Sequence, residues 1–368
     1  MRKNRWFKIL ANVCRLVLAC TFVVSGFTKV IDPWGTAMKI DEYLSIYSLE
    51  ALEPASMAFS IWLCGAELMM GCMLLFKVRI RMVSIFALLS MAFFTGLTLL
   101  SATVLPVEDC GCFGEAIKLS PWETFFKNLL LLPMAVVVWW RYRPDRIFAF
   151  NALEIMLTAT FFCLSMYLGY YCYRHLPLID FLPYRVGVDL WAEINAPVEP
   201  AGEMKTVLVY RNLRTGEERE FSLDDTEWQD AGEWEWVDTR TEGEAPAIRP
   251  LVSEFSLHDG LHDATEEQLT APGRLYMFCV TSFDRLPRGC AKRFARMTER
   301  AREEGARAVC ITPQPLDGVF VRDFGGGEVS CYNIDASTMK TLLRARNGMV
   351  VFDDGVIRAK MNCRDIRP

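Results

Sequence analysis

The chain has little histidine, and its C-terminal half has no excess of basic residues. Only three of the 368 residues are histidine, and the formal net charge is −5. Residues 175–368 hold 24 Lys and Arg against 33 Asp and Glu, so this half lacks the basic surface that nucleic-acid binding requires. The scarcity of histidine also disfavours a zinc centre, which takes four ligands. Apolar residues are abundant instead, at 52% of the chain, which excludes a disordered protein.

Five apolar stretches in the first 174 residues approach the ~20 residues that a helix needs to cross a membrane. They run roughly over residues 9–31, 56–76, 82–105, 122–140 and 147–171. The sequence therefore predicts an α-helical membrane bundle followed by a soluble half.

Basic residues lie mainly on one side of these stretches. Ten Lys and Arg flank the side that holds the N-terminus, whereas only Lys39 and Lys118 lie between spans on the other side. Because positive flanks stay in the cytoplasm, we expect a cytoplasmic N-terminus and an external region beyond Arg174. Residues 17–20 resemble a lipoprotein cleavage box, but the apolar run continues to Ile31, which favours an uncleaved anchor.

The soluble half is expected to have two parts. Residues 174–250 hold six prolines and alternating runs at 206–210, 218–222 and 233–237, which predict a small β region or linker. Residues 251–368 are predicted to form strand, helix, strand, helix and closing hairpin, the order of an α/β thioredoxin-like fold. The fold is degenerate in sequence, because the loop 282–290 after the first buried strand has no Cys-x-x-Cys.

Two of the thirteen cysteines are separated only by a glycine, in Cys110-Gly111-Cys112 between the third and fourth spans. A disulfide over one residue needs unusual backbone angles, which Gly111 and Gly114 can adopt. Strained disulfides are easily reduced and tend to be catalytic or regulatory. We interpret Cys110 and Cys112 as a redox pair, with a static clip or a metal site as alternatives. Cys172, at the end of the fifth span, is a candidate resolving thiol.

The remaining cysteines are expected to be structural. Five lie inside spans, where a thiol packs as a small hydrophobe: Cys14, Cys20, Cys64, Cys72 and Cys163. Cys279 lies on a predicted strand and is expected to be a buried free thiol, with Cys290 nearer the surface. A bond between these two is the alternative.

Glu67 falls near the middle of the second span, where an ionisable residue is costly and suggests function. At ~1.5 Å per residue, Arg15 of the first span lies closer to it in depth than Lys29 does. We expect a buried Glu67–Arg15 pair or, equally, a protonated Glu67 held by hydrogen bonds. Lys29 is expected to extend to the membrane interface.

Residues 16–33 resemble the first span of the DoxX family, notably in Ser25-Gly26-Phe27-Thr28-Lys29 and Asp32-Pro33. Residues 109–114 and 119–128 resemble the MauE branch of that family. The chain is similar to Bacteroidetes-type members with a C-terminal thioredoxin-like domain. The resemblance implies a four-helix core in the inner membrane and a periplasmic tail. MauE kinship further implies a link to methylamine utilisation and to maturation of a disulfide-rich subunit, which concerns only Cys110 and Cys112 here. The fifth span and the missing tail cysteine pair depart from this pattern.

These features predict four parts: a membrane domain over 1–146, a fifth span over 147–173, a β-rich linker over 174–250 and the thioredoxin-like domain over 251–368. The expected function is assistance in extracytoplasmic thiol–disulfide exchange or maturation of a partner protein. The alternative is a non-catalytic assembly or binding protein whose cysteines brace a loop. The expected partners are the bilayer and an external client or redox partner. No cofactor or metal is evident, although a quinone is a candidate electron acceptor.

Overall fold

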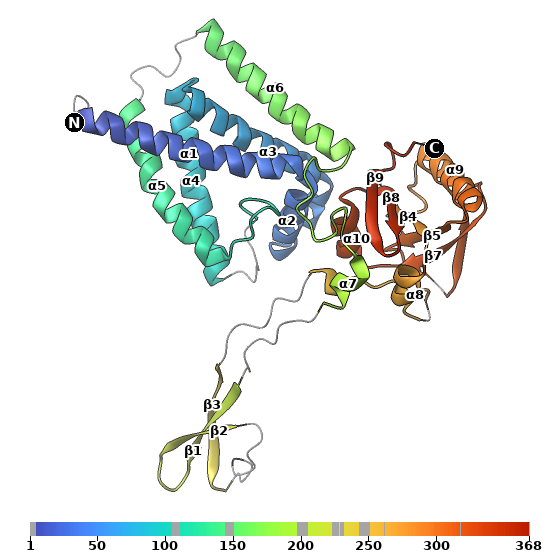
Figure 1. Ribbon diagram of the computed structural model, residues 1–368. Coiled ribbons are helices and arrows are strands. Elements are labelled where there is room, and N and C mark those ends of the chain that lie inside the picture. The colour runs from blue at the N-terminus through green and yellow to red at the C-terminus, as the bar shows by residue number, and fades with distance from the viewer. Residues whose placement is uncertain are drawn as a thin grey trace. The chain divides into compact units, whose positions relative to one another are not determined.

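The computed structural model describes the chain except for residues 1–4, 105–110, 144–150, 197–204, 223–227, 229–231, 243–250, 261, 317 and 368. Its N-terminal part contains five helices long and apolar enough to cross a membrane (Figure 1). They are α1 (Arg5–Ile31), α3 (Glu53–Phe76), α4 (Ile80–Thr103), α5 (Pro121–Tyr142) and α6 (Ala152–Arg174). Each matches one predicted span, so the helical membrane part is confirmed. Residues 105 and 147–150 of the predicted spans lie outside the described residues.

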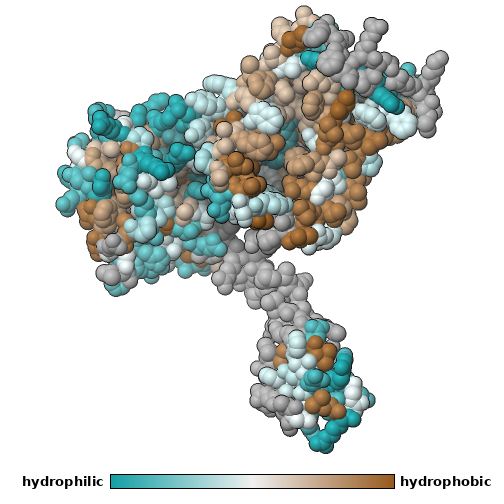
Figure 2. Space-filling view, turned by 180° about the vertical axis from the view of Figure 1, so that it is seen from behind, coloured by the Kyte–Doolittle hydropathy of each residue, from teal (hydrophilic) through white to brown (hydrophobic). Residues whose placement is uncertain are grey.

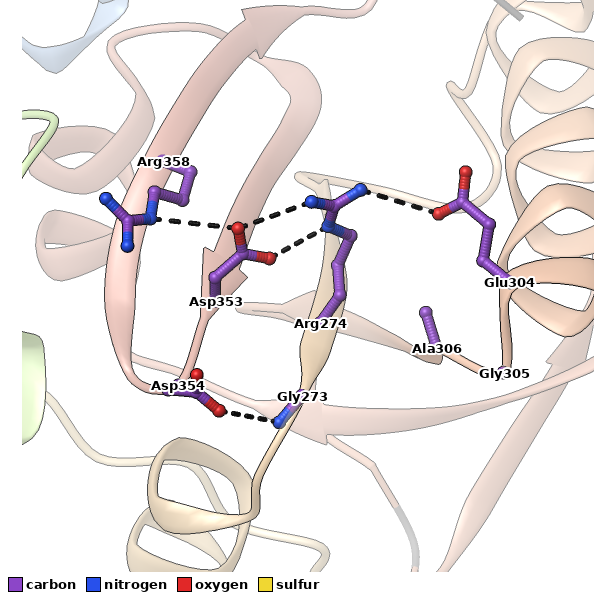
Figure 3. A pocket seen from close by; sticks show the side chains of 8 residues that line it. All are labelled: Gly273, Arg274, Glu304, Gly305, Ala306, Asp353, Asp354 and Arg358. Atoms are coloured by element: carbon purple, nitrogen blue, oxygen red, sulfur yellow. Dashed lines mark hydrogen bonds and ion pairs between the residues drawn. The ribbon is translucent and has the colours of Figure 1, made fainter.

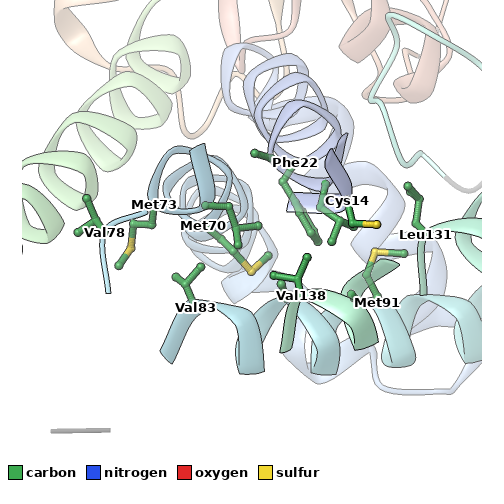
Figure 4. Close-up of a cluster of buried hydrophobic side chains, with 14 residues drawn as sticks. Cys14, Phe22, Met70, Met73, Val78, Val83, Met91, Leu131 and Val138 are labelled. Carbon is green, nitrogen blue, oxygen red and sulfur yellow. The ribbon is translucent and has the colours of Figure 1, made fainter. Parts of the chain in front are cut away.

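The core of the bundle is built by α1, α3, α4 and α5. Phe22 of α1, Met70 of α3, Met91 of α4 and Leu131 of α5 belong to one buried cluster (Figure 4). Cys14 packs in the same cluster as a small apolar side chain, as expected. The outer faces of the long helices carry exposed apolar residues, which Figure 2 shows in brown. This distribution suits contact with lipid tails.

The contact between α1 and α3 is unusually close because two glycines lie in it. A Cβ atom at Gly26 would clash with the backbone of Leu68, and one at Gly71 would clash with the backbone of Val23. The two helices are therefore antiparallel, and their register is fixed by backbone contact rather than by large side chains. α6 packs against α3 in turn, where Gly65 faces Met166.

Short elements connect the long helices. α2 (Pro33–Ile46) follows α1 directly, and the carboxylate of Asp32 caps it by accepting from the Gly35 N–H at 3.2 Å. A 3₁₀ turn, η1 (Glu50–Leu52), leads into α3. We call the end of the bundle at which α1, α4 and α6 end and α3 and α5 begin the tail-side end.

Residues Asp189–Phe255 form a separate compact unit. It contains α7 (Leu190–Ile194), the 3₁₀ turn η3 (Leu251–Glu254) and an antiparallel sheet of β1 (Lys205–Asn212), β2 (Glu218–Ser222) and β3 (Trp234–Glu242) in the order β2-β1-β3. The three strands overlap the three predicted alternating runs. Phe221 is buried, and its ring contacts Trp234 edge-on at 4.8 Å.

The C-terminal part contains α8 (Thr265–Thr270) and a six-stranded sheet of order β6-β7-β5-β4-β8-β9. The strands are β4 (Arg274–Val280), β5 (Arg307–Thr312), β6 (Phe320–Asp323), β7 (Glu328–Asn333), β8 (Asn347–Asp353) and β9 (Val356–Asn362). β4, β5 and β7 are parallel, whereas β6, β8 and β9 pair antiparallel with their neighbours. α9 (Arg288–Glu304) covers one face, and α10 (Ala336–Leu343) precedes β8. We call residues 256–368 the tail.

The predicted order of strand, helix, strand, helix and hairpin is present in the tail, but β6 and β7 were not predicted. Cys279 is a buried free thiol, as expected. Cys290 is not near the surface: it is buried in the first turn of α9 and forms a disulfide with Cys363, which directly follows β9. The disulfide therefore joins the helix on one face of the sheet to the end of the last strand.

Candidate functional site

The loop that follows Cys110 lies against the tail-side end of α1. Cys110 itself lies outside the described residues. Cys112 is half-buried, and its backbone carbonyl accepts a hydrogen bond from the Ser25 hydroxyl. Gly111 and Gly114 both have φ of +57°, so the two glycines adopt the left-handed backbone expected of them. The loop is thus bent into a turn whose backbone contacts a membrane helix.

A buried ion pair lies beneath this loop. Lys29 Nζ of α1 lies 2.8 Å from Glu67 Oε2 of α3, and both side chains are about nine-tenths buried. The Ser25 hydroxyl lies 2.6 Å from Glu67 Oε1 and contacts the Cys112 carbonyl as well. The loop, the ion pair and α1 therefore form one connected polar network, which we call the Ser25–Lys29–Glu67 network.

The predicted Glu67–Arg15 pair is wrong, and so is the expectation that Lys29 extends to the interface. Arg15 donates instead to the carbonyls of Leu74 and Leu75, at 2.5 and 2.8 Å. The reason is the register between α1 and α3, which is fixed by the close contacts at Gly26 and Gly71. In this register Glu67 lies level with Phe27. Arg15 is twelve residues earlier on α1, about 18 Å away along the helix.

Two thiols lie within the electrostatic reach of Lys29. They are Cys112 in the loop and Cys64 on α3. Cys64 is fully buried, and its sulfur lies 3.5 Å from the Thr36 hydroxyl. Of the two, only Cys112 is partly exposed, so a partner can reach its thiol. The arrangement therefore suits chemistry at Cys112.

The tail contacts the same loop through Arg344, which the sequence analysis did not single out. Arg344 follows α10 with φ of +52°, and its side chain is 1% exposed. Its guanidinium lies 3.1 Å from the Asp32 carboxylate and 2.7 Å from Glu115 Oε1. Burial raises the pKa of Asp32, and the neighbouring Arg344 opposes that rise. One tail residue thus links the end of α1 to the loop three residues beyond Cys112.

An ion pair and a histidine–carboxylate contact also hold the tail to the segment after α6. Lys360 Nζ lies 2.6 Å from Asp180, and His175 Nδ1 lies 2.7 Å from Asp365. Burial lowers the pKa of Lys360, against the opposing effect of Asp180. These contacts connect the tail at a second place.

Cys172, the candidate resolving thiol, is fully buried in α6. Its described polar neighbours are the Leu178 backbone and Asp32. Its role as a resolving thiol stays a prediction, as do the roles of Cys110 and Cys112.

A cavity at the end of the sheet where β4 and β5 begin is lined by charged residues that already pair with one another (Figure 3). Arg274 lies 2.8 Å from Asp353 and 3.6 Å from Glu304, and Arg358 lies 3.7 Å from Asp353. The hydrogen bonds of Arg274 lower the pKa of Asp353. Because these charges are mutually compensated, the cavity has no evident ligand chemistry.

Comparison with known proteins supports the membrane part most directly. Residues 7–141 match the family model described as Methylamine utilisation protein MauE, so the resemblance read from the sequence is confirmed there. Residues 204–243 match a domain of unknown function, DUF8463. A stretch of 132 residues is 29% identical to Protein TlpB of Flavobacterium psychrophilum and covers 34% of this chain and 35% of that protein. The chain thus aligns with about a third of that relative's length. No solved structure matches the chain. The five apolar helices and the MauE match identify a multi-pass membrane protein.

Proposed function

We propose that this membrane protein, with its MauE-type region over residues 7–141, takes part in thiol–disulfide exchange through Cys110 and Cys112. The exchange takes place at the tail-side end of the bundle, with an external protein as its client. In this proposal the protein resides in the inner membrane, and the tail is periplasmic. The basic residues Lys77, Arg79 and Arg81 support this orientation, because they lie in the turn between α3 and α4 and at the start of α4, at the opposite end of the bundle.

The observation that carries the proposal is the contact between the Cys112 loop and the Ser25–Lys29–Glu67 network. Ion pairs buried in a membrane helix bundle are expensive and are associated with function. Here the pair does not merely fill the bundle core, since Ser25 connects it to the Cys112 backbone. Cys112 is itself only half-buried, so a client can reach its thiol.

The bonds and electrons of the proposed exchange balance between the cysteine pair and the client alone. The Cys112 thiolate attacks a disulfide of the client, forming a mixed disulfide and releasing one client thiolate. The Cys110 thiolate then attacks the Cys112 sulfur, which closes the Cys110–Cys112 disulfide and releases the second client thiolate. The client gains two electrons, and the cysteine pair loses two. In the opposite direction, a client dithiol is oxidised by the Cys110–Cys112 disulfide.

The tail is assigned a binding role. Its strand order β5-β4-β8-β9, with a helix after β4 and another before β8, supports a thioredoxin-like domain. The start of α9 carries one cysteine rather than a Cys-x-x-Cys pair, and that cysteine is bonded to Cys363. We therefore assign client binding to the tail and exchange to the loop.

The test uses the full chain in nanodiscs. The reduced protein is mixed with an oxidised model peptide, quenched with acid and treated with an alkylating mass tag, and the peptide that carries Cys110 and Cys112 is mapped. We expect the wild type to become oxidised and Cys110→Ser to accumulate a mixed disulfide at Cys112. Cys163→Ser, which removes an exposed thiol from α6, is the matched control and should behave as the wild type. If Cys110 and Cys112 of the folded protein keep the same oxidation state under both oxidant and reductant, exchange is contradicted and a static clip is favoured.

A further inference from the structure

A cavity of about 350 Å³ lies where the tail meets the ends of the membrane helices. Trp34 of α2 and Tyr173 of α6 contribute to its wall from the bundle. The start of α9, the turn before β8 and the end of β9 contribute from the tail, and the wall includes both cysteines of the Cys290–Cys363 disulfide. Its lining is positively charged, because it contains five arginines: Arg174, Arg285, Arg293, Arg346 and Arg364.

The positive charge of this cavity is not compensated by its own wall. No acidic residue is among the described residues that line it. Arg174 lies over the Tyr170 ring at 5.4 Å, and Arg293 donates to the Gly289 carbonyl at 3.3 Å, so these two have neutral partners. Within the described part of the chain, the guanidinium groups of Arg285, Arg346 and Arg364 have no hydrogen-bond or ion-pair partner. Five neighbouring cations repel one another, and an anion between them would remove that cost.

Neutral donors lie in the same wall. The indole N–H of Trp34 is buried and has no acceptor among the described residues. Pro287 caps α9 without a side-chain hydrogen bond. The Cys290 N–H donates to the Pro287 carbonyl at 2.8 Å, whereas the N–H of Gly289, which lines the cavity, has no acceptor among the described residues. Guanidinium groups together with a helix start are the donors that proteins use for phosphate.

The position of the cavity indicates where the phosphate comes from. Tyr173 and Arg174 are among the last residues of the membrane helix α6, and Trp34 follows the membrane helix α1 by three residues. Aromatic and basic residues at the ends of spans lie at the level of lipid head groups. The ring of Trp34 lies 6.0 Å from that of Tyr173, so both belong to one interfacial patch.

We propose that this cavity binds the phosphate of an anionic membrane lipid through its arginines. At about 350 Å³ the cavity is near the lower limit of ligand sites, which suits a head group whose acyl chains remain in the bilayer. The bound lipid would screen the arginines and cover the wall that holds the Cys290–Cys363 disulfide. It would also stabilise the contact between the tail and the bundle, because both contribute to the site.

The test is native mass spectrometry of the full chain in detergent, titrated with dioleoyl phosphatidylglycerol or dioleoyl phosphatidylcholine. We expect the wild type to retain the anionic lipid preferentially. The double variant Arg285→Gln with Arg346→Gln removes two exposed side chains and should bind the anionic lipid about tenfold more weakly. Lys292→Gln with Arg296→Gln removes the same charge from exposed positions of α9 outside the cavity lining, and should bind as the wild type does.

Two controls keep the result interpretable. Peptide mapping without reductant should find the Cys290–Cys363 disulfide in every variant, which reports that the tail is folded. Inorganic phosphate is added as a competitor at the same concentration as the lipid, and we expect it to leave lipid binding unchanged. Equal lipid binding by wild type and the Arg285/Arg346 variant would overturn the proposal. Complete displacement by inorganic phosphate would also overturn it, because the site would then recognise a free anion.

Discussion

Replacement of Arg344 by glutamine should release the tail from the Cys112 loop. The change removes the cation between Asp32 and Glu115 and leaves a shorter, neutral polar side chain. Glutamine has no advantage over arginine at the φ of +52°, so the backbone contribution is nearly unchanged. The effect therefore reports the ion pairs.

The magnitude follows from burial. Arg344 is 1% exposed, Asp32 is 7% exposed and Glu115 is 24% exposed. Removal of one partner from a buried pair costs about 3–5 kcal/mol, because the other charge is left without compensation. We expect about 3 kcal/mol, the lower limit, since Glu115 can be partly solvated and Asp32 can take up a proton. That loss of free energy should raise the population of the state in which the tail has separated from the Cys112 loop about a hundredfold.

Hydrogen exchange of the full chain in nanodiscs measures this population. Amides near Asp32 and in the loop from Gly111 to Glu115 should exchange about a hundredfold faster in Arg344→Gln. Asp32→Asn combined with Arg344→Gln should recover much of the protection, because it removes the unpaired buried carboxylate. Exchange unchanged by Arg344→Gln, or a double variant no better than the single one, would refute the assignment of Arg344 as the link between tail and loop.

Three further predictions concern the ion pair and the cysteines. Lys29→Met should lower the thermal stability of the full chain more than Lys29→Met with Glu67→Gln does, because only the single variant leaves a buried carboxylate without its cation. Serine at both Cys290 and Cys363 should destabilise the tail by about 4 kcal/mol, the chain entropy of a loop closed over a sequence separation of 73, measured by pulse proteolysis in urea. Burial raises the pKa of Cys279 to about 12, so about one thiol in three thousand is ionised at pH 8.5, and Cys279 should resist alkylation until the tail unfolds. Because the folded state holds this proton more tightly than the unfolded chain does, Cys279 should also make the tail less stable as pH rises from about 8.5 to 12.

Each of these predictions has a result that contradicts it. If Lys29→Met and Lys29→Met with Glu67→Gln have equal melting temperatures, the buried Glu67 carboxylate does not depend on the Lys29 cation. A tail whose urea midpoint is unaffected by both serines, or by reductant on the wild type, would exclude the disulfide as a stabilising link. Alkylation of Cys279 at the rate of the half-buried Cys112 in the folded protein would contradict its burial.

The membrane helices could be predicted from the sequence because the bilayer imposes one strong condition, an apolar run of sufficient length. The buried strands β4 and β5 could be found for a similar reason, since nearly all their residues are apolar. β6 and β7 could not, because they are short and mostly polar: Val321, Arg322 and Asp323 of β6 are exposed. The turn between them contains three glycines, which favoured a loop.

The partners of charged residues were the least predictable part of the site. Depth along a helix suggested Arg15 for Glu67, but backbone contacts at Gly26 and Gly71 determine which residues meet, and no single sequence reveals such contacts. Arg344 is two residues from Arg346 in the chain, and nothing in the local sequence distinguishes the buried guanidinium of Arg344 from the exposed one of Arg346. The cysteine pair was recognisable because its spacing is itself unusual.

The covalent continuity from α6 into the tail affects how strong the Arg344 contact must be. Two separate proteins would need a low dissociation constant to remain together at cellular concentrations. A tethered domain instead meets its binding surface at an effective concentration that reaches millimolar for a short connection. Here the chain from α6 to the tail runs through the unit of residues 189–255, but the Lys360–Asp180 pair joins the tail to a residue only six positions beyond Arg174, which shortens the effective connection. Weak contacts therefore remain occupied for most of the time and still open readily, and the tail separates from the loop and returns to it without dissociation of a complex.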